Sequence, residues 1–182
     1  MQTDFIPTTL YHYTNVSGLY GILERSALWA SNIHYLNDSK EFHQAIECAQ
    51  QTLHTESIGL NTGRRADLLK RFKERLEQVS QVSILVASLS ENNDSLSQWR
   101  GYCPPRGGYA VGFNYGRLDL FAKQQGFQLL PCHYSHLEHQ ALLMPLIQQL
   151  LAVVPEELEN ALNVFLSQFV QIAPMMKNVS GA

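Results

Sequence analysis

The stretch SILVASLSENNDSLSQWRGY, residues 83–102, joins a run of apolar residues to a dense group of polar and aromatic ones. The run over 82–90 predicts a buried strand, because it is rich in branched aliphatic side chains and ends in polar turn residues. The segment 94–102 predicts one helical turn, which Asp94 or Ser95 caps. Loops that follow a strand commonly carry binding residues, so this stretch is the centre of a candidate site.

The side chains of this stretch suit the recognition of an anionic ligand. Ser88 and Ser90 lie on one face of the predicted strand, because side chains alternate between the two faces of a strand. The planar guanidinium of Arg100 matches the oxygens of a phosphate or a carboxylate. The candidate binding residues here are Ser88, Ser90, Gln98, Trp99, Arg100 and Tyr102. A structural interpretation stays open, in which Trp99 belongs to the core and Arg100 pairs with an interior carboxylate.

The segment LYHYT, residues 10–14, predicts the first strand and adds two candidate binding residues. His12 and Thr14 lie on one face of this strand, because side chains alternate between its faces. An imidazole beside a hydroxyl can donate to and accept from the hydroxyls of a ribose. His12 can equally be structural between its two tyrosine neighbours, and the sequence leaves both interpretations open.

The segment HYLNDSKEF, residues 34–42, leads into a predicted helix. Tyr35 and Asn37 are candidate ligand contacts, which we expect in the same pocket as the first-strand histidine. In the alternative interpretation these residues only begin the helix, with Asp38 and Glu41 as a capping box. Either carboxylate is also a candidate partner for the arginine of the first stretch.

The whole pattern predicts a single α+β domain over residues 1–182. It has about five strands in a mostly antiparallel or mixed sheet flanked by helices, followed by a C-terminal helical hairpin. The predicted strands cover 9–14, 27–31, 82–90, 109–115 and 127–135. A mixed α/β core is expected over 1–135 and the hairpin over 136–173. The leucine-rich hairpin suits internal packing or the surface of a homodimer.

The composition narrows the class of protein. The chain has 182 residues, 45% of them hydrophobic, and a formal charge of −3, which predicts a globular domain with a real core. A net negative charge does not favour nonspecific binding to nucleic acid. We therefore expect a nucleic acid only as a candidate acceptor substrate or as a ligand bound by its end. No stretch approaches the roughly 20 apolar residues of a membrane span, and a signal peptide is lacking. We therefore expect a cytoplasmic protein without membrane contact.

The cysteines and histidines do not predict a metal centre, and we expect no metal. Cys48, Cys103 and Cys132 are widely spaced and form no CxxC pair, which indicates free thiols. The segment HYSHLEH, residues 133–139, lacks an HExxH pattern, although a metal-dependent phosphoesterase that uses it stays an alternative. The sequence also lacks a Walker loop, a GxGxxG signature and a Ser-His-Asp order.

Three blocks of the sequence together resemble a widespread bacterial domain family of unknown function. They are LYHYTNVSGLYGILERSALWAS (10–31), HYLNDSKEF (34–42) and SLSENNDSLSQWRGY…GGYAVGF (88–113). They match in order and spacing and cover most of residues 9–115. That family is regarded as distantly related to ADP-ribosyltransferases. The resemblance therefore implies an ADP-ribosyltransferase-like transferase domain that uses NAD as a substrate, in bacterial defence or toxin systems.

The resemblance also implies roles for individual residues. His12 with Thr14 takes the position of the first-strand histidine that contacts the NAD ribose in that superfamily. Tyr35, or another aromatic near it, takes the position of the residue that stacks near nicotinamide. A late glutamate directs the reaction in that superfamily.

The family usually continues past a lysine-containing segment into a block with Phe, acids and Glu-Trp-Arg. This sequence reaches Lys177 and stops at Ala182 without that block, so we expect a C-terminally truncated chain without the directing glutamate. Glu41, Glu91 and Glu138 are candidate substitutes. Whether the chain is an enzyme stays open, and a non-catalytic module that binds a nucleotide or a nucleic-acid end is the alternative.

Overall fold

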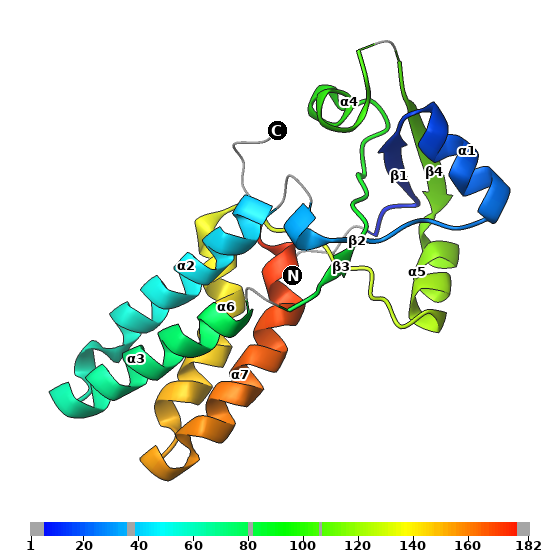
Figure 1. Cartoon of the computed structure of the whole chain (residues 1–182). Coiled ribbons are helices and arrows are strands. Elements are labelled where there is room, and N and C mark those ends of the chain that lie inside the picture. The colour runs from blue at the N-terminus through cyan, green and yellow to red at the C-terminus, as the bar shows by residue number, and fades with distance from the viewer. Residues whose placement is uncertain (1–5, 36–38, 80–81, 106, 178–182) are drawn as a thin grey trace. The chain divides into compact units, whose positions relative to one another are not determined.

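The computed structural model describes residues 6–35, 39–79, 82–105 and 107–177. These residues form seven α-helices and two antiparallel sheets of two strands each, so the protein is α+β (Figure 1). The expected single sheet of about five strands is not seen among them. The chain divides into two compact units, the strand unit (Met1–Ala30 and Ala87–Leu130) and the bundle unit (Ser31–Val86 and Pro131–Val179).

The strand unit is built around a two-stranded sheet. β1 (Thr9–Thr14) pairs antiparallel with β4 (Tyr109–Asn114), in a register that places His12 opposite Val111. Its helices are α1 (Val16–Arg25), α4 (Leu96–Tyr102) and α5 (Tyr115–Gln124). Both strands and α4 agree with the sequence-based expectation within a few residues.

The strand unit has a small core. Leu10 and Tyr13 are the buried apolar residues among its described residues, and none of its three helices contains a fully buried side chain. Several large apolar side chains are exposed instead, such as Tyr20 and Leu23 of α1 and Leu120 of α5. Little of the stability of this unit can therefore come from burial.

The bundle unit contains four long helices that lie side by side (Figure 1). They are α2 (Ser39–Glu56), α3 (Thr62–Val79), α6 (His136–Ala152) and α7 (Leu158–Ile172). α2 packs against α3 and α6, and α7 packs against the same two helices. Short 3₁₀ turns occupy Ile33–Tyr35, Ser57–Gly59, Pro155–Glu157 and Ala173–Met175.

One apolar cluster runs through the bundle unit. Phe42, Phe72, Phe165 and Phe169 are each at most 2% exposed. α3 shows how the sequence produces this packing, because its buried residues recur at helical spacing and its other faces carry charges. α6 and α7 occupy the region expected for the C-terminal hairpin and pack against each other. No described helix is both long and apolar enough to cross a lipid bilayer.

The prediction of a long buried strand over 82–90 is wrong. Only Leu85–Val86 forms a strand, β3, which pairs antiparallel with β2 (Ser31–Asn32) in the bundle unit. Leu85 is 51% exposed. Beyond Val86 the chain enters the strand unit, where Ser90 forms a separate bridge with Tyr11. The apolar run is divided because its two halves pair with different partners.

Two other predicted strands also differ from the structure. The segment 27–31 contributes only its last residue to β2. The segment 127–135 forms no regular strand, and its one ladder contact is an isolated parallel bridge between His133 and Met176. Pro131 lacks a backbone N–H to donate, which is consistent with the interruption of this segment.

Candidate functional site

The two edges of β1 organise the candidate site in the strand unit. β4 pairs along one edge, and Ser90 lies along the other. The Tyr11 N–H donates to the Ser90 carbonyl at 2.8 Å, and the Ser90 N–H donates back to the Tyr11 carbonyl at 2.9 Å. This reciprocal pair brings the end of the 82–90 segment beside the first strand, as the candidate site requires.

His12 is held by the same segment. Its Nδ1 lies 3.2 Å from the carbonyl oxygen of Ser88, a residue 76 positions away in the sequence. A carbonyl only accepts, so Nδ1 is the donor in this bond. In the neutral imidazole Nε2 then carries a lone pair and can accept a hydrogen bond from a ligand hydroxyl. The structure therefore joins two of the predicted site segments and fixes the orientation of the ring.

Tyr13 organises the polar loop that follows. Its side chain is buried, and its hydroxyl donates to the Asn92 carbonyl at 2.7 Å and accepts from the Ser95 N–H at 2.9 Å. Its ring packs edge-on against Trp99, with centroids 4.6 Å apart. Tyr13 was not among the predicted site residues. A tyrosine on the apolar face of a strand gives a signal for burial, but not for the loop that it holds.

Hydrogen bonds within the loop position α4. The Trp99 indole Nε1–H donates to Asp94 Oδ1 at 2.8 Å, and the Asp94 N–H donates to Asn92 Oδ1 at 2.9 Å. The hydroxyl of Ser90 accepts from the Asn92 N–H at 3.1 Å. Asp94 thus orients Trp99, and Ser95 stands at the N-cap of α4 without a capping bond from its side chain. Hydrogen bonds therefore connect this loop both to β1 and to α4.

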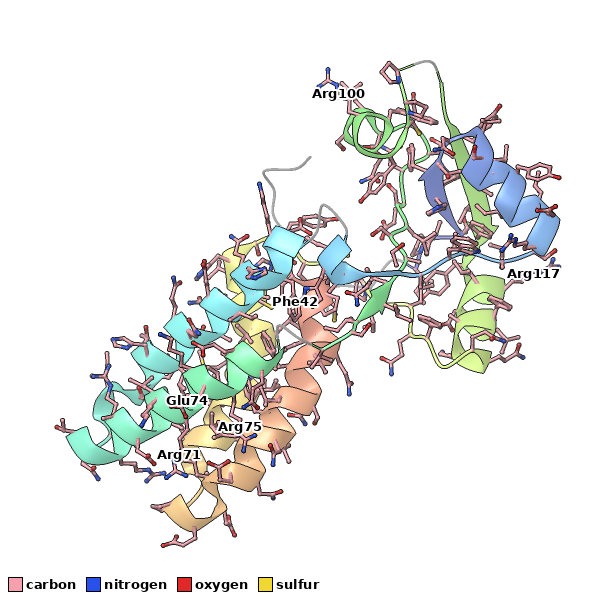
Figure 2. The ribbon with its side chains drawn as sticks, in the orientation of Figure 1. Phe42, Arg71, Glu74, Arg75, Arg100 and Arg117 are labelled. Carbon is pink, nitrogen blue, oxygen red and sulfur yellow. The ribbon has the colours of Figure 1, made fainter. Side chains whose placement is uncertain are left out.

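The polar side chains of α4 differ in exposure. Gln98 and Trp99 are partly buried, whereas Arg100 and Tyr102 are exposed. Arg100 points away from α4, which leaves its guanidinium accessible to a ligand (Figure 2). α4 therefore carries both the groups that anchor it to β1 and a cation that solvent can reach.

Thr14 lies against the start of α1. Asn15 caps this helix by accepting from the Gly18 N–H at 2.9 Å. A Cβ on Gly18 would lie only 2.0 Å from Oγ1 of Thr14, so any larger residue there would displace that hydroxyl. The thiol of Cys103 donates to the Thr14 carbonyl at 3.5 Å. Thr14 is thus packed on both sides at the end of β1.

Tyr35 belongs to the bundle unit. Tyr35 ends a 3₁₀ turn, and Asn37 lies outside the described residues together with Asp38. The expectation that they share a pocket with His12 therefore stays a prediction. Glu41, a candidate partner of Arg100, accepts a hydrogen bond from Lys177 Nζ at 2.8 Å.

Two histidines of the segment 133–139 are joined by a hydrogen bond at the start of α6. His139 is buried and its Nε2 donates to the His133 carbonyl at 2.7 Å. Ser135 and Glu138 form a capping box, and the Ser135 donors lower the pKa of Glu138 to about 2. The described part of the chain contains no group of three or more His, Cys, Asp or Glu side chains that could hold a metal ion.

Comparisons with protein-family models, with curated proteins and with solved structures gave no match. Function is therefore inferred from the side chains of the strand unit. They provide an oriented imidazole at β1, a serine-rich strand end beside it and an exposed guanidinium on a short helix. Each of these groups can bind hydroxyl or phosphate oxygens.

Proposed function

We propose that this chain is an ADP-ribosyltransferase-like domain that binds NAD, or a related nucleotide, through its strand unit. The observation that carries the proposal is the bond between His12 Nδ1 and the Ser88 carbonyl, 3.2 Å long, at the edge of β1. It orients an imidazole whose second nitrogen can bind a ribose hydroxyl. The resemblance of the LYHYT and DSLSQWRGY blocks to the bacterial family supports the same assignment.

The other residues of the site have complementary roles in this proposal. Arg100 binds the pyrophosphate, because a guanidinium donates to two phosphate oxygens at once. Trp99 forms a wall of the site, held by Asp94 and by the ring of Tyr13. Gln98, Ser90 and Tyr102 supply further hydrogen bonds to the ligand.

Transfer of ADP-ribose needs a carboxylate. Breaking the bond between nicotinamide and ribose builds positive charge on the sugar, which a carboxylate stabilises as in glycoside hydrolysis. Glu41 is paired with Lys177, and Glu138 caps α6. Glu91 is exposed and directly follows Ser90 in the strand unit. We therefore assign Glu91 as the candidate carboxylate of this chain.

Isothermal titration of NAD tests the binding proposal. We expect wild-type protein to bind NAD, and His12→Ala to weaken binding at least tenfold, about 1.4 kcal/mol. His136→Ala is the matched control, since this exposed histidine lies at the start of α6 in the bundle unit. Arg100→Ala should also weaken binding, whereas Arg117→Ala, at another exposed arginine of the strand unit, should not. A wild-type protein that binds neither NAD nor ADP-ribose would refute the proposal.

A second candidate function is nucleotide binding without turnover. The hydrogen bonds described for His12 and Ser90 involve backbone carbonyls and amides, not a carboxylate. Chromatographic detection of released nicotinamide separates the two functions. A transferase releases nicotinamide and loses this activity in Glu91→Gln while keeping its affinity for NAD. If the chain is only a binding module, the wild-type protein and Glu91→Gln bind NAD equally well and neither releases nicotinamide.

A further inference from the structure

The outer face of the α6–α7 hairpin has no formal charge along most of its length. Residues 139–155 and 160–176 contain no Asp, Glu, Lys or Arg. Exposed positions in these segments carry amides, small residues and apolar residues, such as Gln148, Asn163 and Val164. α3, in the same unit, carries charged residues along its whole exposed side. Depletion of charge is typical of the centre of a protein–protein interface.

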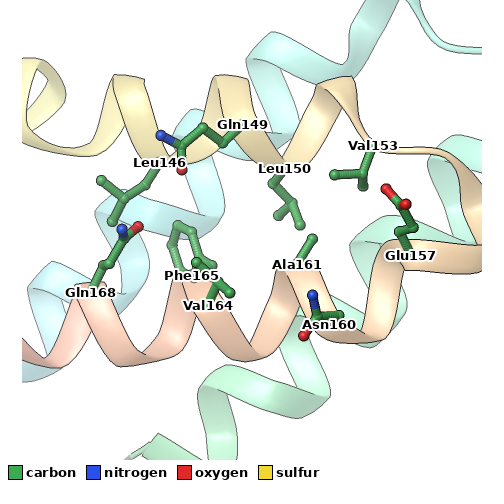
Figure 3. Close-up of a pocket in the computed structure, with 10 residues that line it drawn as sticks. All are labelled: Leu146, Gln149, Leu150, Val153, Glu157, Asn160, Ala161, Val164, Phe165 and Gln168. Carbon is green, nitrogen blue, oxygen red and sulfur yellow. The ribbon is translucent and has the colours of Figure 1, made fainter.

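The same face is hollowed between its two helices. The hollow has a volume of about 210 Å³, with Leu150, Ala161 and Phe165 at its base (Figure 3). Val164, which is 43% exposed, lies at its side. Among the described residues that line it, Glu157 is the one with a charge. The apolar base of such a hollow is filled favourably by apolar side chains rather than by water.

We propose that this face is the interface of a homodimer, in which the α6–α7 hairpins of two copies pack antiparallel about a two-fold axis. A two-fold interface places the same surface against itself, so a charged face would oppose like charges. This face avoids most of that cost, because Glu157 is the one charged residue among the described residues that line its hollow. Glu157 and Gln168 lie at opposite ends of the hollow (Figure 3), so antiparallel pairing sets each carboxylate against an amide that can donate to it.

The size of the face suits such a dimer. α6 has 17 residues and α7 has 15. At about 1.5 Å per residue the hairpin is roughly 25 Å long, and two helices side by side are roughly 20 Å wide. The face therefore offers on the order of 500 Å² per copy, or about 1,000 Å² in total, the lower end for a specific interface. We expect a dimer that dissociates on dilution.

Sedimentation velocity of the full chain over about a hundredfold range of concentration tests this dimer. We expect wild-type protein to dimerise and Val164→Lys to raise the dissociation constant at least tenfold by placing like charges near the axis. Val82→Lys is the matched control, because Val82 is 42% exposed in the same unit but outside this face. Gln149→Lys gives a second test if Val164→Lys loses helical circular dichroism.

A charge exchange makes the test specific for the two-fold arrangement. Val164→Glu alone should be monomeric for the same reason as Val164→Lys. An equimolar mixture of the two variants should form a heterodimer, because opposite charges then meet. A wild-type protein that is monomeric at every concentration overturns the proposal. So does a dimer that Val164→Lys and Gln149→Lys leave as stable as Val82→Lys does.

Discussion

The bundle unit and the strand unit are held together in different ways. In the bundle unit the ring centroids of Phe72 and Phe165 lie 4.8 Å apart, and those of Phe165 and Phe169 lie 5.7 Å apart. All three rings are fully buried. In the strand unit Leu10 and Tyr13 are the buried apolar residues described, and hydrogen bonds around β1 fix the loop and α4. Units with few buried contacts open locally at low free energy, as ligand-binding elements often do. We therefore expect the bundle unit to be the more stable part of the chain and the strand unit to open at a lower free energy.

The largest change in the free energy of unfolding should follow from a substitution in the core of the bundle unit. Phe165→Ala removes a ring that is 2% exposed and leaves a cavity, so we expect a loss of about 3–5 kcal/mol in the free energy of unfolding. Urea denaturation followed by circular dichroism measures it. Phe121→Ala, at a side chain 47% exposed in the strand unit, should change that free energy by less than about 1 kcal/mol. Equal losses of unfolding free energy in both variants would contradict the claim that buried packing contributes more in the bundle unit than in the strand unit.

A smaller and local effect should follow from removal of one hydroxyl in the strand unit. Tyr13→Phe keeps the ring against Trp99 but leaves the Asn92 carbonyl and the Ser95 N–H without their partner. We expect the strand unit to lose about 1–3 kcal/mol of local stability. Hydrogen exchange should accelerate over residues 92–102 and stay unchanged in α3. Tyr20→Phe, at a side chain 65% exposed, is the control. Equal acceleration in α3 would show that the two units do not open separately.

The smallest effect concerns the start of α6. The donors of Ser135 lower the pKa of Glu138 from its ordinary 4.5 to about 2, so the folded state favours the carboxylate. Its contribution to stability is therefore fully present above pH 4.5 and is lost as the pH falls through about 2. Glu138→Gln should remove this part of the acid dependence, which thermal unfolding at several pH values measures. An unchanged acid profile would contradict the capping role.

The sequence predicts the helices of the molecule better than its sheets. Helical periodicity is local, so the spacing of apolar residues within α3, α6 and α7 is enough to identify each as a helix. A segment forms a strand only when its backbone pairs with another segment, which can be far away in the sequence. The run over 82–90 has the composition of one buried strand, but Leu85–Val86 pairs with β2 and Ser90 with Tyr11. Composition alone does not reveal this division.

The candidate site shows the same limit. The structure joins His12 to the Ser88–Ser90 segment, and the convergence of Arg100 with them stays a prediction. Tyr13 was missed, because its role depends on contacts with Asn92 and Ser95, about 80 residues away in the sequence. Aromatic residues on strands are mostly structural, and nothing local distinguishes a tyrosine that holds a loop.

Hydrogen exchange of the full chain with and without NAD tests the central claim most directly, because it reports both units in one experiment. If the strand unit binds the nucleotide, NAD slows exchange in β1 and over residues 88–102, and leaves α3 and α7 unchanged. Saturating NAD that protects neither segment, or that protects only helices of the bundle unit, would contradict the assignment.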